Sequence, residues 1–227
     1  MTNNATATFA GRSLIWAFVK AAGSPTEPKN IGWGDSAVTG SANQDVALFK
    51  PQTEARVAGT STFISTSFLA DTYQVSGTIT CTNAGKTITE AGLFDTTTAS
   101  STTTIATSSQ AAAATTITLA ATVGPSSNNF YIQVENEVQL VTGGQNTTTF
   151  TVTRSQLGSV TAAHAIGAVV TSGGDGLANT NAGFGGQTAT SAQVLAKGGN
   201  MFAHADFAGI ALNVNDSIAF TWKDQLT

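Results

Sequence analysis

The side chains that could take part in acid–base or metal chemistry are few and widely spaced. The sequence holds two histidines, His164 and His204. A metal site needs three or four converging ligands, usually with close local spacing, and neither histidine has a second histidine or a cysteine nearby. His204 and Asp206 lie two residues apart, so on a β-strand they share one face. We expect a solvent-facing pair there, and we expect His164 to cap or pack in a loop.

Two carboxylates, Glu135 and Glu137, flank a predicted hairpin tip with the same parity. Paired carboxylates can perform acid–base work, or bind Ca²⁺ together with other oxygens. Because a hairpin tip is exposed to water, we expect both to be ordinary solvated carboxylates. Residues 173–176, Gly-Gly-Asp-Gly, are likewise expected to form a flexible turn rather than a cation-binding loop.

The patterns typical of nucleophilic catalysis and nucleotide binding are missing. The sequence has no G-x-S-x-G nucleophile elbow, and the glycines around Phe184 lack a strand–helix context for a phosphate site. The single cysteine, Cys81, cannot form an intramolecular disulfide, and its place in an alternating pattern indicates a small buried side chain. The sequence therefore predicts no catalytic residue, no bound metal and no cofactor.

Charge is scarce along the whole chain. Charged residues make up 10% of the 227 residues and the net charge is −4, against a usual charged share of about 25%. The lysines and arginines are dispersed, whereas a nucleic-acid groove needs clustered cations, so no nucleic-acid partner is expected. No stretch approaches the ~18 apolar residues of a membrane span, so no membrane partner is expected. A neutral, hydroxyl-rich surface costs less to desolvate than a charged one, which favours permanent contact with other proteins.

The elements that must position these residues are predicted to be β-strands. Alternating apolar residues indicate half-buried strands, and the alternation changes parity near Gly59, which indicates a bulge or two strands joined there. Residues 21–40 are rich in glycine and proline and read as an ordered contact loop anchored by Trp33. The strands expected before residue 100 cover residues 13–19, 46–49, 55–68, 72–81 and 87–95.

The fold class is predicted to be all-β: a β-sandwich or barrel-like domain with a second small β module inserted. The expected order is an N-terminal arm at 1–12, and a main domain formed by 13–95 together with 197–227. Residues 96–114, rich in Thr, Ser and Ala, are expected to be a linker or a solvent-facing edge. Residues 115–171 are expected to form the small module from four or five short strands, and 172–196 a glycine-rich connection.

Two segments resemble structural proteins of tailed bacteriophages. TITEAGLFD (87–95), followed by GNMFAHADFAGIALNVNDSIAFTW (199–222), resembles a β domain common in such proteins. Residues 129–170 resemble a small phage β module that carries E-x-M/V-x-V near a hairpin and then R-G-Q-x-G-T and A-H-x-x-G. Here the arginine is Arg154, and the sequence departs from that pattern at Ser155 and Ser159. We assign these residues no special role on that basis.

The resemblance implies a non-catalytic virion protein, assembled in the cytoplasm of the host bacterium. We expect a capsid decoration (cement) protein that binds the outer surface of the head shell, as a homotrimer that contacts itself and the major capsid protein. Two alternatives stay open: a tail, baseplate or fibre component, and a module that binds host-surface glycan. A hydrolase would depend on His204 and Asp206. The expected partner contacts are Asn3, Asn4, Phe9, Trp33 and Phe184.

Overall fold

The structure is a computed structural model that describes residues 5–8, 11, 26–124, 129–173 and 198–225. These residues form three antiparallel sheets and one short 3₁₀ turn, η1 (Gln156–Gly158). The all-β prediction is confirmed. The strand expected at 13–19 lies outside the described residues.

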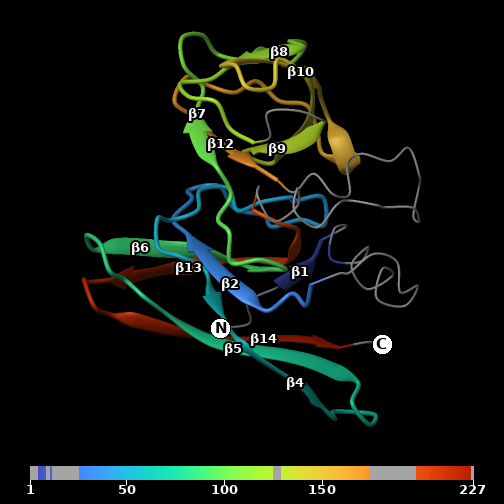
Figure 1. The fold of residues 1–227 in the computed structure, drawn as a ribbon, viewed down its shortest axis with the longest axis vertical. Helices are drawn as coiled ribbons and strands as arrows, with labels where there is room; N and C mark the ends of the chain where they lie inside the picture. Colours follow the sequence, from blue (N-terminus) through green and yellow to red (C-terminus); the bar gives the residue numbers. More distant parts are fainter. Residues whose placement is uncertain (1–4, 9–10, 12–25, 125–128, 174–197, 226–227) are drawn as a thin grey trace.

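Two sheets pack face to face as a β-sandwich in the lower part of Figure 1. One has five strands in the order β1-β13-β6-β2-β3, and the other has three in the order β14-β5-β4. The first sheet contains β1 (Ala5–Ala7), β2 (Asn30–Gly34), β3 (Val57–Ala58), β6 (Lys86–Phe94) and β13 (Met201–Leu212). The second contains β4 (Thr60–Ile64), β5 (Thr72–Thr80) and β14 (Ser217–Gln225).

Apolar side chains from the facing surfaces of these two sheets fill the sandwich. Ile31 and Ile88 come from the five-stranded sheet, Val75 and Ile79 from the three-stranded one, and none is more than 2% exposed. Residues 46–49, expected to be a strand, are buried but irregular. They cover the other face of the five-stranded sheet, so half of β6 is buried on both sides.

The change of parity at Gly59 marks the point where the chain passes from one sheet to the other. It separates β3 in the five-stranded sheet from β4 in the three-stranded sheet. A Cβ atom on Gly59 would lie 2.6 Å from Val75 Cγ1 and 2.8 Å from the Ser76 carbonyl oxygen. Only glycine therefore fits at this position. The sequence allowed either a bulge or two strands joined at Gly59, and the structure has the two strands.

Six short strands build a third sheet in the upper part of Figure 1, in the order β7-β12-β9-β10-β11-β8. Its edge strands meet at a bridge between Ile105 and Leu119, so the sheet curls back on itself as a small barrel. Phe130 and Phe150 stack edge to face inside it, 5.7 Å apart. The strands are β7 (Thr102–Thr104), β8 (Thr116–Thr118), β9 (Phe130–Val134), β10 (Glu137–Gly143), β11 (Thr149–Thr153) and β12 (Val169–Ser172).

Two segments differ from the sequence-based expectation. Residues 96–114 contain β7 and the buried side chains of Ile105 and Gln110, so part of the expected linker belongs to the barrel. Residues 30–34, inside the expected loop, form β2 between β6 and β3, and all five are buried. The sequence does not predict these strands. The threonine run of β7 and the glycine-flanked tryptophan of β2 show no clear alternation of apolar residues.

Arg56 fixes the place where the chain leaves the sandwich and returns to it. Its Nη1 donates to the carbonyl oxygens of Thr96, at 3.2 Å, and Gly198, at 2.6 Å. Its Nη2 donates to Ser100 Oγ at 3.2 Å, and its guanidinium lies 3.4 Å from the centre of the Phe94 ring. The buried guanidinium of Arg56 thus joins the segment that leaves the sandwich, at Thr96 and Ser100, to the segment that returns, at Gly198.

Further hydrogen bonds hold the two ends of the inserted segment together and join the barrel to the sandwich. Asp95 accepts from the backbone N–H of Asn200 at 2.8 Å and from its side-chain amide at 3.0 Å. The backbone N–H of Val46 donates to Gln133 Oε1 in the barrel at 3.2 Å. The barrel is therefore seated on the loop that covers the five-stranded sheet.

The barrel core makes a first prediction about stability. Phe150→Ala is expected to lower the free energy of unfolding by about 3–5 kcal/mol, because a buried ring is replaced by a cavity. The change is measured by urea denaturation. Val160→Ala is the control, because Val160 is 80% exposed and surface changes usually stay within about 0.5 kcal/mol. Equal losses in the two variants would contradict the assigned core.

Candidate functional site

His204 lies in a closed polar cluster beneath the loop of residues 40–50. Its Nδ1 is 2.7 Å from Asp45 Oδ2 and its Nε2 is 3.0 Å from Glu90 Oε2. The side chain of His204 is 0% exposed, and its ring stacks edge to face on Phe49 at 4.8 Å. The expected solvent-facing pair with Asp206 is wrong, because the loop covers this face of β13.

The carboxylates of this cluster hold the loop onto the sheet. Asp45, Glu90 and Asp206 each accept at least one backbone N–H, which is how a buried negative charge is stabilised without a metal or a lysine. The donors are Phe49 at 2.9 Å and Lys50 at 2.8 Å to Glu90, Ala42 at 2.7 Å to Asp45, and Gly40 at 3.1 Å and Ser41 at 2.8 Å to Asp206.

The charge of His204 follows from these contacts. Burial by itself lowers the pKa of a histidine, but the hydrogen bonds to Asp45 and Glu90, and their negative charges, raise the pKa of His204 to about 9. The side chains of Asp45 and Glu90 are 1% and 0% exposed. A substrate has no access to this cluster. Its role is to hold the loop of residues 40–50 against the five-stranded sheet.

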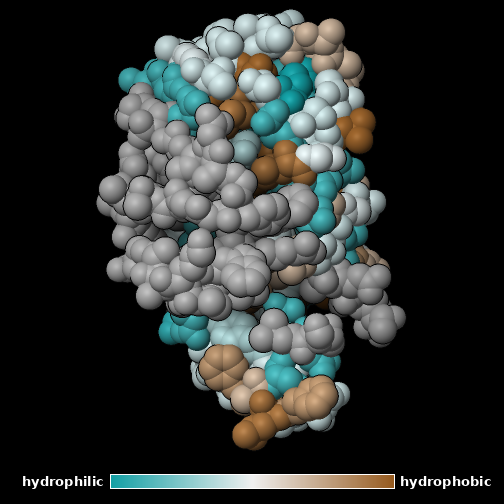
Figure 2. Space-filling model, turned by 90° about the vertical axis from the view of Figure 1, so that its right-hand side faces the viewer, coloured by the Kyte–Doolittle hydropathy of each residue, from teal (hydrophilic) through white to brown (hydrophobic). Residues whose placement is uncertain are grey.

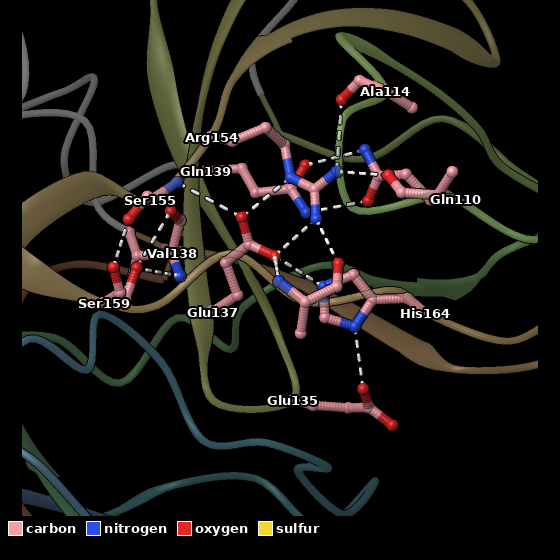
Figure 3. Close-up of polar contacts among 12 residues, drawn as sticks. Gln110, Ala114, Glu135, Glu137, Val138, Gln139, Arg154, Ser155, Ser159 and His164 are labelled. Atoms are coloured by element: carbon pink, nitrogen blue, oxygen red, sulfur yellow. Dashed lines mark hydrogen bonds and ion pairs between the residues drawn. The ribbon is translucent and has the colours of Figure 1, made fainter.

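A second closed cluster lies in the barrel, around Glu137 at the start of β10 (Figure 3). Arg154 Nε is 2.7 Å from Glu137 Oε1, and Arg154 Nη2 is 2.6 Å from Oε2. His164 Nε2 is 2.7 Å from the same Oε2, while its Nδ1 is 2.7 Å from Glu135 Oε2. The side chain of Glu137 is 0% exposed, so the expectation of a solvated carboxylate is wrong for this residue. Glu135 is 44% exposed at the tip.

Backbone groups complete the shell around Glu137. The N–H groups of Ser155 and Ala162 donate to its two oxygens at 3.1 and 3.2 Å. The remaining guanidinium donors of Arg154 bind the carbonyl oxygens of Ala111, Ala114 and Ala162. Figure 3 shows how Arg154 thereby joins strand β11 and two loops to one carboxylate.

A pair of glutamines extends this cluster. The side chains of Gln110 and Gln139 exchange two hydrogen bonds, of 3.1 and 2.8 Å. Gln110 and His164 also exchange two backbone hydrogen bonds of 2.9 Å. His164 is thus held by its backbone as well as by its ring, and it is 1% exposed.

The pKa values of the cluster follow from these contacts. Burial would raise the pKa of Glu137, but the hydrogen bonds from His164, Arg154 and the backbone outweigh it and lower the pKa to about 2. Burial would lower the pKa of His164, but its bonds to Glu137 and Glu135 raise it. Glu137 is therefore ionised at neutral pH, and its contacts with His164 favour the protonated form of that ring.

The segment that follows Arg154 has an uncommon backbone. Ser155 has φ 55° and ψ 47°, a left-handed conformation that favours glycine. Leu157, at φ 55°, and Gly158, at φ 87°, continue the tight wrap. The wrap brings the N–H of Ser155 to the carboxylate of Glu137.

Of the five partner contacts expected from the sequence, only Trp33 lies among the described residues, and it is buried. Asn3, Asn4, Phe9 and Phe184 lie outside the described residues. Trp33 lies in β2, is 2% exposed and packs edge to face on Phe220. Its ring therefore faces the core rather than the solvent.

Three large exposed apolar side chains lie together on the hairpin between β4 and β5. Phe63 is 70% exposed, Phe68 77% and Leu69 91%. Figure 2 shows hydrophobic residues gathered at the lower end of the molecule, where Figure 1 places this hairpin. Sequence reasoning missed it, although one signal was present: residues 57–70 contain no charged side chain.

The tip of this hairpin is ordered by one carboxylate. Asp71 accepts the backbone N–H groups of Thr66, Ser67 and Phe68, each at 2.8 Å. These bonds lower the pKa of Asp71 far enough to outweigh the effect of desolvation, so it stays ionised. Phe68 and Leu69 are therefore presented to the solvent on a fixed loop.

The described residues contain no group of three or more His, Cys, Asp or Glu side chains arranged to hold a metal ion. Among the same residues, no helix has the length and the apolar character needed to cross a membrane.

Removing the carboxylate of Glu137 is expected to destabilise the protein strongly. Glu137→Gln should lower the free energy of unfolding by about 3–5 kcal/mol, because Arg154 is left as a buried charge without its partner. Urea denaturation measures the change. Glu27→Gln makes the same substitution in an exposed ion pair with Lys29, where a loss of at most about 1 kcal/mol is expected. A small loss for Glu137→Gln would contradict the cluster.

The two histidines predict a fall of stability with rising pH. The pKa of His204 is about 9 in the folded protein and ~6.5 in the unfolded chain. Its contribution is therefore complete below pH ~6.5 and is lost as the pH rises to about 9, with a size of roughly 3 kcal/mol. Urea denaturation between these pH values measures the decline. His204→Gln should remove most of the slope and leave the part due to His164, and a flat wild-type profile would contradict the assignment.

Comparisons of the chain with known protein families, with curated proteins and with solved structures find no match.

Proposed function

We propose that this chain is a non-catalytic structural protein of a tailed-phage particle, and that it serves as a capsid decoration protein on the outer surface of the head shell. The observation that carries this proposal is how the chain uses its few charges. Asp45, Arg56, Glu90, Asp95 and Glu137 are all buried, and each has hydrogen bonds to other parts of the chain. What is left for partners is a surface poor in charge and rich in hydroxyl groups, with an apolar hairpin between β4 and β5.

The resemblance to a phage β module gains support from the arrangement of its motif residues. Arg154 and His164, which the pattern contains, both bind Glu137 in the preceding hairpin. Ser155 has the left-handed backbone that explains a glycine at this position of the pattern. The motif thus joins parts of the barrel to one another through Glu137, which suits a structural protein.

An enzymatic role has little support from the two histidines. Both are 1% exposed or less, and both ring nitrogens of each are bonded to carboxylates. Asp206, the expected partner of His204 in a hydrolase, instead accepts the backbone N–H groups of Gly40 and Ser41.

A glycan-binding role would need exposed tryptophan or tyrosine rings near Asp and Asn. Among the described residues, Trp33 is buried, Trp222 and Tyr73 pack against the sandwich core, and Tyr131 is partly buried in β9. The proposed partners are therefore proteins: other copies of this chain, expected as a homotrimer, and the major capsid protein. A tail, baseplate or fibre component shares the same chemistry and is the alternative within this class.

The proposal is tested with particles assembled in the host without this chain. We expect such particles to have complete tails but heads that break open at a lower temperature, because the neutral contacts that lock the shell subunits are gone. Heat release of the packaged nucleic acid measures head stability. Imaging of normal particles should place many copies of the chain on the shell, in a fixed ratio to the major capsid protein.

Two other outcomes would each overturn the decoration role. Stable heads with missing or defective tails, and a few copies at one vertex, would identify a tail component. Complete and stable particles that no longer adsorb to the host would identify a receptor-binding module.

A further inference from the structure

The two edges of the three-stranded sheet differ in charge. β5 is the central strand, β14 forms one edge and β4 the other. Among the described residues no strand pairs with the outer side of β4. β14 carries Lys223 and Asp224, charged side chains of the kind that discourages pairing between sheet edges. β4, with the sequence TSTFI, carries none.

The side chains around the β4 edge are also left uncovered. Phe63 and Phe68 are 70% and 77% exposed, and a phenylalanine buries at least about 150 Å² when covered. Together with Leu69, these rings offer a few hundred Å² of apolar surface, a large part of the ~800 Å² that each partner contributes to a stable interface. The edge strand itself would supply much of the remainder.

We propose that β4 pairs antiparallel with β4 of a second copy of this chain, about a two-fold axis through Thr62. The pairing joins two three-stranded sheets into one continuous sheet. A two-fold interface uses the same patch on both subunits, so the patch must be complementary to itself. An open antiparallel edge with neutral side chains meets this condition.

The register places specific residues together. With the axis at Thr62, Phe63 lies opposite Ser61 of the partner subunit, on the same face of the sheet. The two Phe63 rings are then diagonal neighbours across the junction, roughly 7–8 Å apart at their Cα atoms and within reach of each other. Each ring already packs on Tyr73 of its own chain at 5.8 Å, so a row of aromatic rings would cross the interface.

The surroundings of the axis do not oppose this contact. The chain has a net charge of −4, but residues 57–70 carry no charge. Asp224 lies opposite Tyr73 on β14, on the far side of β5 from β4. Glu27 bonds to Tyr73 and to Ser61 of β4, and its charge is paired with Lys29 at 2.9 Å. The ordered tip held by Asp71 reduces the entropy lost when Phe68 and Leu69 are covered.

The experiment uses charge at the axis, in the full-length chain. T62K places two lysines directly opposite each other and should halve the number of chains in the assembly, measured by sedimentation equilibrium. T62E should do the same. Mixing the two variants should restore the wild-type assembly, because each lysine then faces a glutamate. T78K adds the same charge at an exposed position of β5 in the same sheet and should leave the assembly unchanged.

The outcomes decide the proposal independently of where the chain acts in a particle. The pairing makes the copy number even, so the proposed homotrimer would occur as two trimers joined through β4. A wild-type chain that is monomeric, or assembled in an odd number of copies, would overturn it. So would a T62K chain that assembles like the wild type, or a mixture of T62K and T62E that stays dissociated. Each variant is expected to fold, because Thr62 is exposed and its replacement leaves the core intact. Circular dichroism checks this.

Discussion

A buried carboxylate is stable only when donors surround it, and this constraint organises both parts of the protein. Glu137 accepts from Arg154, His164 and two backbone N–H groups, and so joins β10, β11 and two loops of the barrel. Glu90 accepts from His204 and two backbone N–H groups, and so joins the loop of residues 40–50 to the sheet. Although only 10% of its residues are charged, the chain uses several of these ionic groups for internal order.

The strands could be predicted where side chains alternate, and could not where they do not. The patterns at 72–81 and 87–95 correspond to β5 and β6 within a few residues, and the parity change at Gly59 was correctly placed. β2 and β7 were missed because NIGWG is buried on every side and TTT shows no apolar face. Burial on both faces removes the alternation on which such a prediction depends.

The polar clusters could not be predicted from the sequence, for a different reason. Asp45, Glu90 and His204 are separated by many residues, and only the sheet order and the covering loop bring them together. The local spacing of His204 and Asp206 suggested a pair that does not form. The position of Glu137 at a hairpin tip indicates a solvated residue, yet Arg154 and His164 both bind it. Long-range register decides such contacts, and no local pattern encodes it.

The junction formed by Arg56, Asp95 and Asn200 bears on how such a protein changes over evolution. The ends of the barrel segment meet at the hydrogen-bonded pair of Asp95 and Asn200, next to the paired strands β6 and β13. A recombination event that exchanged this segment would need to preserve only the short spacing between its two ends. Such an exchange could place outer modules of different size on the same sandwich.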